Sequence, residues 1–504
     1  MLMKRVLLPL LVILGAATAF AAHPVPELVK DINTRPAPDG AKIQYPTARG
    51  DTLFFTACDA AHGQELWKSD GTPRGTKLLK DVLPGLGSSF PRELTVVGNT
   101  LFFIADDFQH GFQLWKSDGT PDGTRLVKDL AGDTPALAPK SLKAAGNKLF
   151  FLLPGENGLD RLWTSDGTEE GTVEVLPDDA SWDSPHDLTI FKDTLVFVRE
   201  DSVYRTDGTA AGTISLGSID TSLEPVQYFV GDDILYFVTT DWWWEQSLWK
   251  SDGSPGGTTL VTRFDGEFDE GEILGNTLVF SMWASGLGYE LWCSDGTSSG
   301  TQLLKDLAPD DSSYPEKLTV AGKFIYFTAE PPETGSELWR TDGTEAGTTL
   351  VADLNPGAES SIIVELQPVG ERLYFSTWDD TGKLWVTDGS ARGTRLLKSE
   401  PHYHDLGHLV SGENVLFFVA SEQLWRTNGA KRGTVQLTGL RDRSGSASSR
   451  YSLLYPAGPI QRAGGRVFFS AYDGNRTSLW SSRGTRATTY QVNVGESGDT
   501  PIWS

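Results

Sequence analysis

The sequence predicts an all-β protein made of about ten copies of one four-stranded unit, and three observations support this fold class. A segment of the form Leu-Trp-x-Ser/Thr-Asp-Gly-Thr recurs with 40 to 55 residues between successive aromatic anchors. One copy contains four short segments of strand composition, at 93–97, 100–105, 112–117 and 124–129, with almost no helical periodicity between them. The second segment is apolar at consecutive positions, which indicates burial on both faces. Four-stranded units covered on both faces by their neighbours form the blades of a β-propeller.

The N-terminal residues have the features of a cleavable secretory signal. Lys4 and Arg5 precede an apolar run at 6–14, and small residues surround Phe20. The run is too short to span a bilayer, and no later stretch is apolar enough for a transmembrane helix. We therefore expect residues 1–22 to be a signal peptide and the mature protein to be exported, to an extracellular, periplasmic or cell-surface location, without membrane insertion.

Residues 23–39 are expected to hold a linker and a strand that closes the ring. Residues 28–32 read Leu-Val-Lys-Asp-Ile and match the expected outer strands at 126–130 and 303–307. An isolated outer strand before the first copy suits a closed ring, because the last blade can borrow it. This favours a ring over a linear stack. Ten blades exceed the usual four to eight, so two smaller propellers in one chain remain an alternative.

Residues 40–504 hold the ten copies, and each copy has an aromatic anchor followed by a tight turn. In the turn, Asp accepts backbone N–H groups, the first Gly supplies a positive φ, and a second Gly-Thr pair re-enters the strand. Ten identical catalytic sites in one chain would be unusual, so we interpret the turn as structural and the anchor as a packing residue between blades. The residues concerned are Trp67, Asp70, Trp115, Asp118, Trp163, Asp166, Trp249, Asp252, Trp292, Asp295, Trp339, Asp342, Trp385 and Asp388, with Tyr204, Trp425 and Trp480 as the anchors of the other copies.

With these motifs the chain resembles the ELWxxDGT-repeat proteins, a family of secreted bacterial proteins found notably in myxobacteria and their relatives. The resemblance covers essentially the whole mature chain, and its specificity comes from the repetition of the motif. It implies secretion, but it implies no activity, because the family is defined by its repeat. The turn is also similar to the Asp-box of sialidases and sortilin-like propellers, although its spacing differs.

The charge and cysteine content exclude several classes of partner and of architecture. The chain has 43 basic and 67 acidic residues and a net charge of -24. Such a surface repels phosphate backbones and anionic lipid, so we expect no nucleic-acid partner and no binding to membrane surfaces. Cys58 and Cys293 are the two cysteines of the sequence, so a disulfide framework does not stabilise the fold. We expect a monomer with an ordinary apolar core.

Comparison of the copies separates two ends of the blades. The first-to-second and third-to-fourth connections are short and nearly constant, and the alternation of hairpins places both at one end, the constant rim. The second-to-third and fourth-to-first connections vary and lie at the opposite end, the variable rim. Because binding residues usually lie on variable loops of a rigid scaffold, we expect function at the variable rim.

An acidic residue recurs at this rim, six positions after the first core residue of the second strand. In a closed ring these carboxylates would form an acidic crown. Such a crown could hold Ca²⁺, which favours several oxygen ligands, or attract cationic partners. The alternative is that each acid is a solvated turn residue at the end of a strand. The crown consists of Asp59, Asp107, Asp201, Asp241, Asp379, Glu422 and Asp473, with Glu156 and Glu330 at offset positions and no acid in copy six.

Copy five carries three adjacent tryptophans in the same loop, Trp242, Trp243 and Trp244. Three indole rings on a solvent-facing loop suggest a stacking surface for sugar rings or for a partner protein. The alternative is that some of them pack beneath the loop. Both interpretations remain open, and the three residues are candidate ligand-binding residues.

A second candidate site lies between copies eight and nine, where His402, His404, Asp405 and His408 lie within seven residues. Imidazoles are common ligands of transition metals. The sequence shows no second ligand cluster, and spacing alone does not define a metal geometry. We treat these four residues as candidate ligand-binding residues.

Two classes of function fit these observations. The first is an exported scaffold that binds an unidentified protein, glycan or matrix ligand, with Ca²⁺ as the one cofactor under consideration. The second is a propeller hydrolase or lyase acting on extracellular polysaccharide, and a quinoprotein dehydrogenase is a more remote third option. The regular features are distributed around the ring instead of being concentrated in one pocket, and no nucleophile elbow, P-loop or dinucleotide fingerprint is present. We therefore favour the scaffold and assign no catalytic residue.

Overall fold

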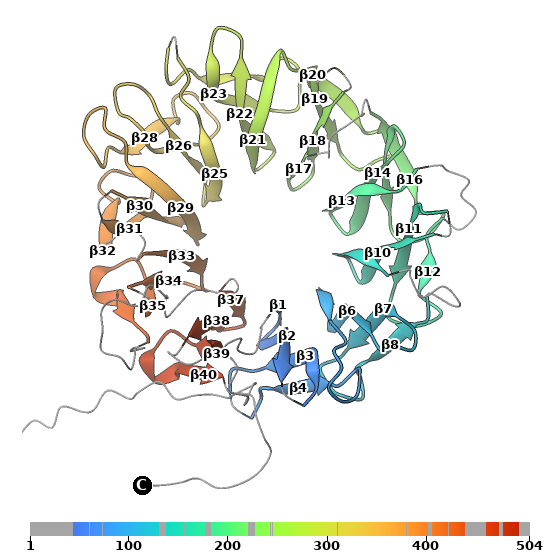
Figure 1. Cartoon of the computed structure of the whole chain (residues 1–504). Coiled ribbons are helices and arrows are strands. Elements are labelled where there is room, and N and C mark those ends of the chain that lie inside the picture. The colour runs from blue at the N-terminus through green and yellow to red at the C-terminus, as the bar shows by residue number, and fades with distance from the viewer. Residues whose placement is uncertain are drawn as a thin grey trace, which may run out of the picture.

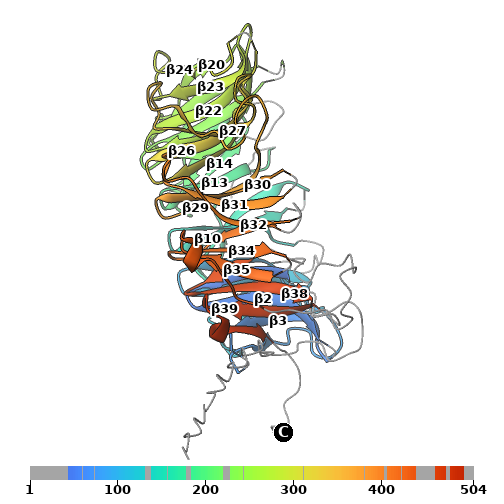
Figure 2. The same ribbon diagram turned by 90° about the vertical axis from the view of Figure 1, so that its left-hand side faces the viewer.

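The computed structural model shows an all-β ring of ten four-stranded antiparallel sheets (Figure 1), which confirms the predicted propeller. It describes residues 44–492 apart from 60, 73, 131–137, 156, 177–182, 220–226, 242, 244, 310, 380, 402–405, 422, 439–459 and 473–476. Figure 2 shows the ring from its edge, as a body much thinner than it is wide. Within these described residues, no helix is both long and apolar enough to cross a bilayer.

Each blade is a meander in which the strands follow one another from the centre of the ring outwards. The innermost strands are β1 (Gln44–Arg49), β5 (Arg92–Val97), β9 (Lys140–Ala145), β13 (His186–Phe191), β17 (Gln227–Val230), β21 (Gly266–Leu274), β25 (Glu316–Ala321), β29 (Ile362–Val369), β33 (Leu406–Ser411) and β37 (Gln461–Ala463). The second strands are β2 (Thr52–Asp59), β6 (Thr100–Asp106), β10 (Lys148–Pro154), β14 (Thr194–Arg199), β18 (Leu235–Thr240), β22 (Thr277–Ala284), β26 (Phe324–Ala329), β30 (Arg372–Trp378), β34 (Leu416–Ala420) and β38 (Arg466–Tyr472).

The two outer strands of each blade flank the repeated turn. The third strands are β3 (Gly63–Ser69), β7 (Phe112–Ser117), β11 (Asp160–Ser165), β15 (Ser202–Thr206), β19 (Gln246–Ser251), β23 (Gly288–Ser294), β27 (Glu337–Thr341), β31 (Gly382–Thr387), β35 (Gln423–Thr427) and β39 (Thr477–Ser482). The outermost strands are β4 (Lys77–Lys80), β8 (Arg125–Lys128), β12 (Val173–Glu174), β16 (Ile214–Ser218), β20 (Thr259–Arg263), β24 (Gln302–Lys305), β28 (Thr349–Ala352), β32 (Arg395–Glu400), β36 (Val435–Gln436) and β40 (Thr489–Val492). Two short 3-10 helices, η2 (Lys431–Gly433) and η3 (Arg486–Thr488), lie in the last two of these turns.

The core consists of apolar layers between neighbouring blades. The second strand supplies both of its faces, as its apolar sequence predicts: Leu101, Phe102, Phe103 and Ile104 are all at most 2% exposed. The described residues form ten buried clusters, one for each pair of neighbouring blades, and one of them joins blade 1 to blade 10. A linear stack of ten blades would have no such tenth layer, so the blades form one closed ring.

Polar contacts across the blade boundaries show the same closure. Lys148 Nζ of blade 3 donates to the carbonyl of Asp207 in the turn of blade 4 at 2.7 Å. At the junction of the chain ends, Ser481 Oγ of blade 10 donates to the carbonyl of Gly71 in the turn of blade 1 at 3.0 Å. Blade 10 has its own outer strand, β40. The expected closing strand at 28–32 and the expected signal at 1–22 lie outside the described residues.

The repeated turn is held by hydrogen bonds among its own residues. In blade 2, Asp118 Oδ1 accepts the backbone N–H of Thr120 at 2.8 Å and its hydroxyl at 2.7 Å. Gly119 has φ +93°, and a Cβ on Gly123 would lie 2.1 Å from the same carboxylate oxygen. Both glycines are therefore required by the turn itself, one by its backbone angle and one by the close approach of the aspartate.

The aromatic anchors pack on the second strand of their own blade. Trp115 stacks on Phe103 with ring centroids 6.4 Å apart, and Trp480 stacks on Phe469 at 6.1 Å. Trp67 is only 3% exposed, and it belongs to the cluster that joins blade 1 to blade 10. The anchor thus lies in the layer between two blades.

Candidate functional site

The second-to-third and fourth-to-first loops lie together at the variable rim. The backbone N–H of Gln64, at the start of β3, donates to Ser88 Oγ in the following fourth-to-first loop at 2.9 Å. The same contact joins Tyr289 to Ser312 at 3.1 Å. In blades 1 and 6, these bonds connect the second-to-third loop to the fourth-to-first loop before the chain enters the next blade.

Buried glutamates beneath these loops accept hydrogen bonds from them, a feature that the sequence analysis missed. Glu65 is fully buried, and it accepts the N–H groups of Val82 and Ser89 and the hydroxyl of Ser89, the last at 2.5 Å. Glu290 binds the N–H of Leu307 and both donor groups of Ser313 in the same way. Burial raises the pKa of Glu65 to about 7. The available signal was Glu before Leu-Trp together with a Ser-Ser pair in the next loop.

The described crown acids bind their own loops. Asp59 Oδ1 accepts the N–H groups of Ala61 at 2.9 Å and of His62 at 2.6 Å. Asp241 and Asp379 likewise accept N–H groups two residues further on, at 2.8 and 2.7 Å. In the described part of the chain, no three His, Cys, Asp or Glu side chains gather as a metal site. The carboxylates of Asp59, Asp241 and Asp379 thus stabilise the loops that carry them, and Ca²⁺ binding by the crown stays a prediction.

The contacts of two further acids, one in the crown and one at an offset position, involve their backbone atoms. Asp201 is exposed, and its carbonyl accepts the N–H of Ile219 at 2.8 Å. The backbone N–H of Glu330, one of the two offset acids, donates to the carbonyl of Ser313 at 2.6 Å. The remaining acids, Glu156, Glu422 and Asp473, lie outside the described residues.

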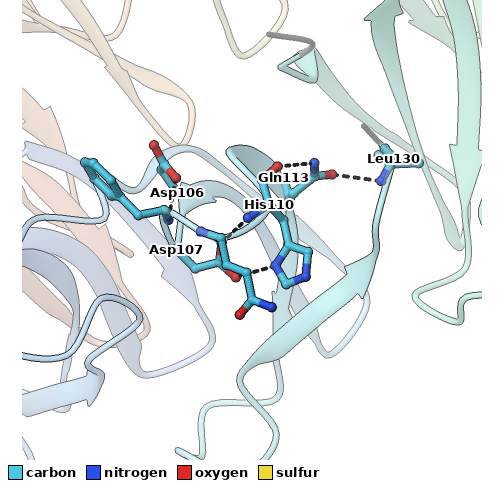
Figure 3. A network of polar contacts seen from close by, with 7 residues as sticks. Asp106, Asp107, His110, Gln113 and Leu130 are labelled. Carbon is cyan, nitrogen blue, oxygen red and sulfur yellow. Dashed lines mark hydrogen bonds and ion pairs between the residues drawn. The ribbon is translucent and has the colours of Figure 1, made fainter. Parts of the chain in front are cut away.

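Two neighbouring loops contain an aspartate–histidine pair, shown for blade 2 in Figure 3. Asp107 Oδ1 accepts the N–H groups of Gln109 and His110, and its Oδ2 contacts His110 Nδ1 at 2.7 Å. The buried Gln113 amide connects the His110 carbonyl, at 2.8 Å, to the N–H of Leu130, at 2.9 Å. The loop is thereby fixed to the start of the connection to blade 3.

This pairing changes the acidity of both side chains in blade 2. Partial burial acts to raise the pKa of Asp107, but hydrogen bonds from His110 and Gln109 outweigh it and lower this pKa. The hydrogen bond to Asp107 raises the pKa of His110. In blade 1, His62 Nδ1 lies 2.7 Å from Asp59 Oδ2 in the same arrangement. A carboxylate that orients an imidazole is a usual acid–base device.

The two local clusters named in the sequence analysis are only partly described. Trp243 is 84% exposed, whereas Trp242 and Trp244 lie outside the described residues. His402, His404 and Asp405 also lie outside them. His408 is exposed in β33, and its backbone N–H donates to Glu365 Oε1 of the preceding blade at 2.8 Å.

The contact of His408 is one of several hydrogen bonds between the innermost strands of adjacent blades, which the sequence analysis missed. A carboxylate on one innermost strand accepts a backbone N–H from the bulge of the next innermost strand. Glu93 accepts from Leu142 at 2.9 Å, and Glu270 accepts from Leu318 at 3.0 Å. A bulge leaves backbone groups unpaired within its own sheet. Some rim carboxylates therefore hold adjacent blades together and are not free for a ligand.

An open hollow lies between blades 3 and 4 at this rim, and its lining includes Arg161, Glu174 and Asp183. Its lining carries charges of both signs, and Arg161 Nη1 lies 3.7 Å from Glu174 Oε1 within it. The neighbouring Asp183 Oδ2 accepts the N–H of Glu200 at 2.8 Å. One ion pair, Arg161 with Glu174, therefore lies within the hollow.

The exposed aromatic side chains show the clearest asymmetry between the rims. The described residues include six large aromatic side chains among the exposed hydrophobics, and all six lie at the variable rim. Exposed apolar side chains on one face mark candidate interaction surfaces, and these six come from two arcs of the rim, at blades 1–2 and blades 5–6. The six are Tyr45, Phe90, Phe108, Trp243, Trp283 and Tyr314.

Comparison with known proteins leaves the family open. No family model matches the chain, and no curated protein matches it. Among solved structures it is similar to a prolyl endopeptidase, with 11% identity and a TM-score of 0.34, over 65% of this chain and 54% of the other. A puromycin hydrolase gives 14% identity and 0.33, over 72% and 54%. An oligogalacturonate lyase in complex with manganese gives 12% and 0.30, over 66% and 85%.

The chain therefore spans only about half the length of the two hydrolases, 54% in each case. Likeness at these values does not bear on the activity of this chain.

Proposed function

We propose that this chain is an exported, ELWxxDGT-type β-propeller that acts as a binding scaffold. Its variable rim would hold a protein, glycan or matrix ligand. The observation that carries the proposal is the position of the exposed aromatics: all six in the described residues lie at the variable rim. Aromatic rings combine a large apolar area with a rigid shape, and they are enriched where proteins bind ligands.

The polar groups of the two rims support the same proposal. The turn aspartates of the constant rim are occupied by threonine or serine donors of their own turns. At the variable rim, the buried glutamates hold the loops in place, which leaves the exposed aromatics on a supported surface. Binding then needs little reordering of the loops, and such preorganisation lowers the free-energy cost of association.

A propeller hydrolase or lyase acting on extracellular polysaccharide remains the second candidate. The observation in its favour is the pair of aspartate–histidine contacts in blades 1 and 2, at 2.7 Å each. This candidate would also use the chemistry of His402, His404 and Asp405, which lie outside the described residues.

The experiment screens the purified full chain on a glycan array and against immobilised extracellular matrix polysaccharide, with product release measured in parallel. A variant in which Phe90, Phe108 and Trp243 are replaced by Ala is expected to lose binding by about tenfold or more. The matched control replaces Val173 and Leu260, exposed apolar residues at the constant-rim end of the outer strands, by Ala.

Equal binding by the rim variant and wild type to every ligand captured would overturn the scaffold proposal. Product release that His110→Ala abolishes would establish the enzyme instead. A chain that captures none of the arrayed ligands and releases no product would contradict both the glycan and the matrix forms of the proposal.

A further inference from the structure

Blade 6 carries an aromatic strip at the variable rim, in the copy that has no crown acid. In its sheet, Glu267 of β21 is the cross-strand partner of Trp283 in β22, and Trp283 is the partner of Tyr289 in β23. Side chains of directly paired residues in antiparallel strands lie on the same face. These three residues therefore form a row across the end of the sheet.

The following loop extends this row. Tyr314 stacks on Tyr289 with ring centroids 5.7 Å apart and an angle of 28° between the planes. Trp283 is 42% exposed and Tyr314 is 51% exposed. We call Trp283, Tyr289 and Tyr314 the aromatic strip. The loop that carries Tyr314 is fixed from below, because Ser313 donates its N–H and hydroxyl to the buried Glu290.

Carboxylates surround the aromatic strip. Glu267 Oε2 accepts the Tyr289 hydroxyl at 3.1 Å. Partial burial, followed by the nearby charges of Glu316 and Glu267, raises the pKa of Asp269. Lys317 Nζ lies 3.5 Å from Glu316, and within the described residues no ion pair reaches Glu267 or Asp269. The negative charges therefore repel one another beside exposed aromatic rings.

Equivalent positions in two other blades show what blade 6 lacks. One position lies six residues before the glycine of the first-to-second turn, and it holds Arg92 in blade 2, Lys140 in blade 3 and Asp269 in blade 6. The other lies three residues before the aromatic anchor, and it holds Phe112, Asp160 and Tyr289 in the same three blades. Arg92 Cζ lies 4.1 Å over the ring of Phe112. Lys140 Nζ lies 2.9 Å from Asp160. Blades 2 and 3 thus supply a cation from the innermost strand, whereas blade 6 has a carboxylate there.

A cation over an aromatic ring and next to carboxylates gains both cation–π and charge-assisted interactions. The net charge of -24 favours the approach of a cationic partner and disfavours a polyanion. We propose that the aromatic strip binds lysine or arginine side chains of a cationic segment of a partner protein. This inference rests on the proposed function, because it specifies the ligand chemistry at one part of the same rim.

The test measures binding of a hexalysine peptide to the full chain by calorimetry, with a hexa-acetyllysine peptide as the uncharged probe. The double variant Trp283→Ala with Tyr314→Ala keeps the net charge of the protein. It is expected to bind hexalysine about tenfold more weakly, which corresponds to about 1.4 kcal/mol. Asp269→Arg would supply the in-chain cation that Arg92 supplies in blade 2, and is expected to reduce binding at least as much.

Leu260→Ala is the matched control, since Leu260 is an apolar residue at the constant-rim end and is 41% exposed, close to the 42% of Trp283. Its hexalysine affinity is expected to stay that of wild type, and circular dichroism and thermal midpoints check that every variant folds. The proposal is overturned if hexalysine does not bind, or if the strip variant and Leu260→Ala bind it equally, because a diffuse negative surface then explains the result.

A third result would overturn only this inference. A neutral glycan that binds wild type, is lost in the strip variant and is unaffected by salt would assign the aromatic strip to sugar, while the scaffold function would stand. Loss of the scaffold function itself would instead appear as unchanged ligand binding in the variant of Phe90, Phe108 and Trp243.

Discussion

The two rims of the ring carry similar numbers of loops but use their polar groups differently. At the constant rim, Asp118 accepts two hydrogen bonds from Thr120, and a Cβ at Gly123 has no room beside it. At the variable rim, the side chains of Trp243 and Trp283 are 84% and 42% exposed. The repeated motif of this chain is therefore needed for the structure of the blade, and we expect functional residues where the copies differ.

The variable rim is itself divided into structural and exposed parts. Glu65, Glu290 and Glu337 are buried beneath its loops, and they recur in three of the ten blades. Exposed residues lie above them and differ from blade to blade. Variation among copies therefore does not by itself identify a binding residue, because some positions at this rim are as structural as the repeated turn.

The largest effect on stability is expected for Glu65→Ala. Glu65 lies at the variable rim but has a structural role, so the two rims do not divide simply into function and structure. The change leaves three buried donors, two N–H groups and a hydroxyl, without their acceptor. Each such group costs about 1–3 kcal/mol, so we expect a loss of about 3–5 kcal/mol in the free energy of unfolding by urea. Glu65→Gln keeps an acceptor oxygen and should lose much less. A loss for Glu65→Ala below about 1 kcal/mol would refute this role.

The next effect is a pH dependence of stability. The pKa of Glu65 is raised from 4.5 to about 7 in the fold, so the folded chain keeps a proton that the unfolded chain loses over this range. Stability should therefore rise by about 3 kcal/mol as the pH falls from 7 to 4.5, and should then change little through this group. Thermal midpoints across this range measure it. A profile of Glu65→Gln as steep as that of wild type would assign the dependence to other groups.

Below this range the constant rim should respond in the opposite direction. Hydrogen bonds from the side chain and then the backbone of Thr120 hold the pKa of Asp118 below its usual value of 3.8. A carboxyl with a lowered pKa stabilises the fold above 3.8, and this contribution is lost as the pH falls through its folded-state value. We therefore expect the free energy of unfolding to be highest at a pH below the range in which Glu65 loses its proton and above the folded-state pKa of Asp118.

A smaller effect is expected for Asp118→Ala at the constant rim. The turn loses the acceptor for two donors of Thr120, which should lower the free energy of unfolding by about 1–2 kcal/mol and leave ligand binding unchanged. Asp118→Asn is the natural control, because Asn428 occupies this place in blade 9 and its Oδ1 accepts the N–H of Ala430 at 3.2 Å. Weakened ligand binding by a folded Asp118→Ala variant would contradict the assignment of function to the variable rim.

The smallest effect on stability is expected for Trp243→Ala, because the side chain is 84% exposed. The free energy of unfolding should change by no more than about 0.5 kcal/mol. A destabilisation above about 2 kcal/mol would show that the ring packs in the fold, which would favour the packing interpretation over the binding one. Urea unfolding measures the difference, with Phe108→Ala as the comparison, because Phe108 is also mostly exposed, at 72%.

Much of the blade could be predicted because its determinants lie close together in sequence. The turn closes within eight residues, from Ser117 to Thr124, whose hydroxyls lie 2.8 Å apart. The apolar run at 101–104 indicates both of its buried faces directly. The buried Glu65 was not identified, because its acceptor role depends on Ser89, 24 positions further along the chain, and on the path of the loop between them.

The blade 6 strip could not be found in the same way. Glu267, Trp283 and Tyr289 become neighbours only through the pairing register of three strands, and β21 contains a bulge that shifts this register. Tyr314 joins them through a loop that begins after β24. Copy six also lacks the recurring acid of the other copies, so the acidic motif does not point to the blade that has the aromatic strip.

The sequence alone determined the all-β class, the four strands of each blade and the identity of the two rims, because these follow from side-chain alternation and from turns that close locally. Only the tertiary structure decided that ten blades form one ring, through the apolar layer and the Ser481–Gly71 contact that join blade 10 to blade 1. It also decided which rim residues are buried supports and which stand in solvent. Both depend on contacts between segments far apart in the chain, and the local pattern does not encode such distances.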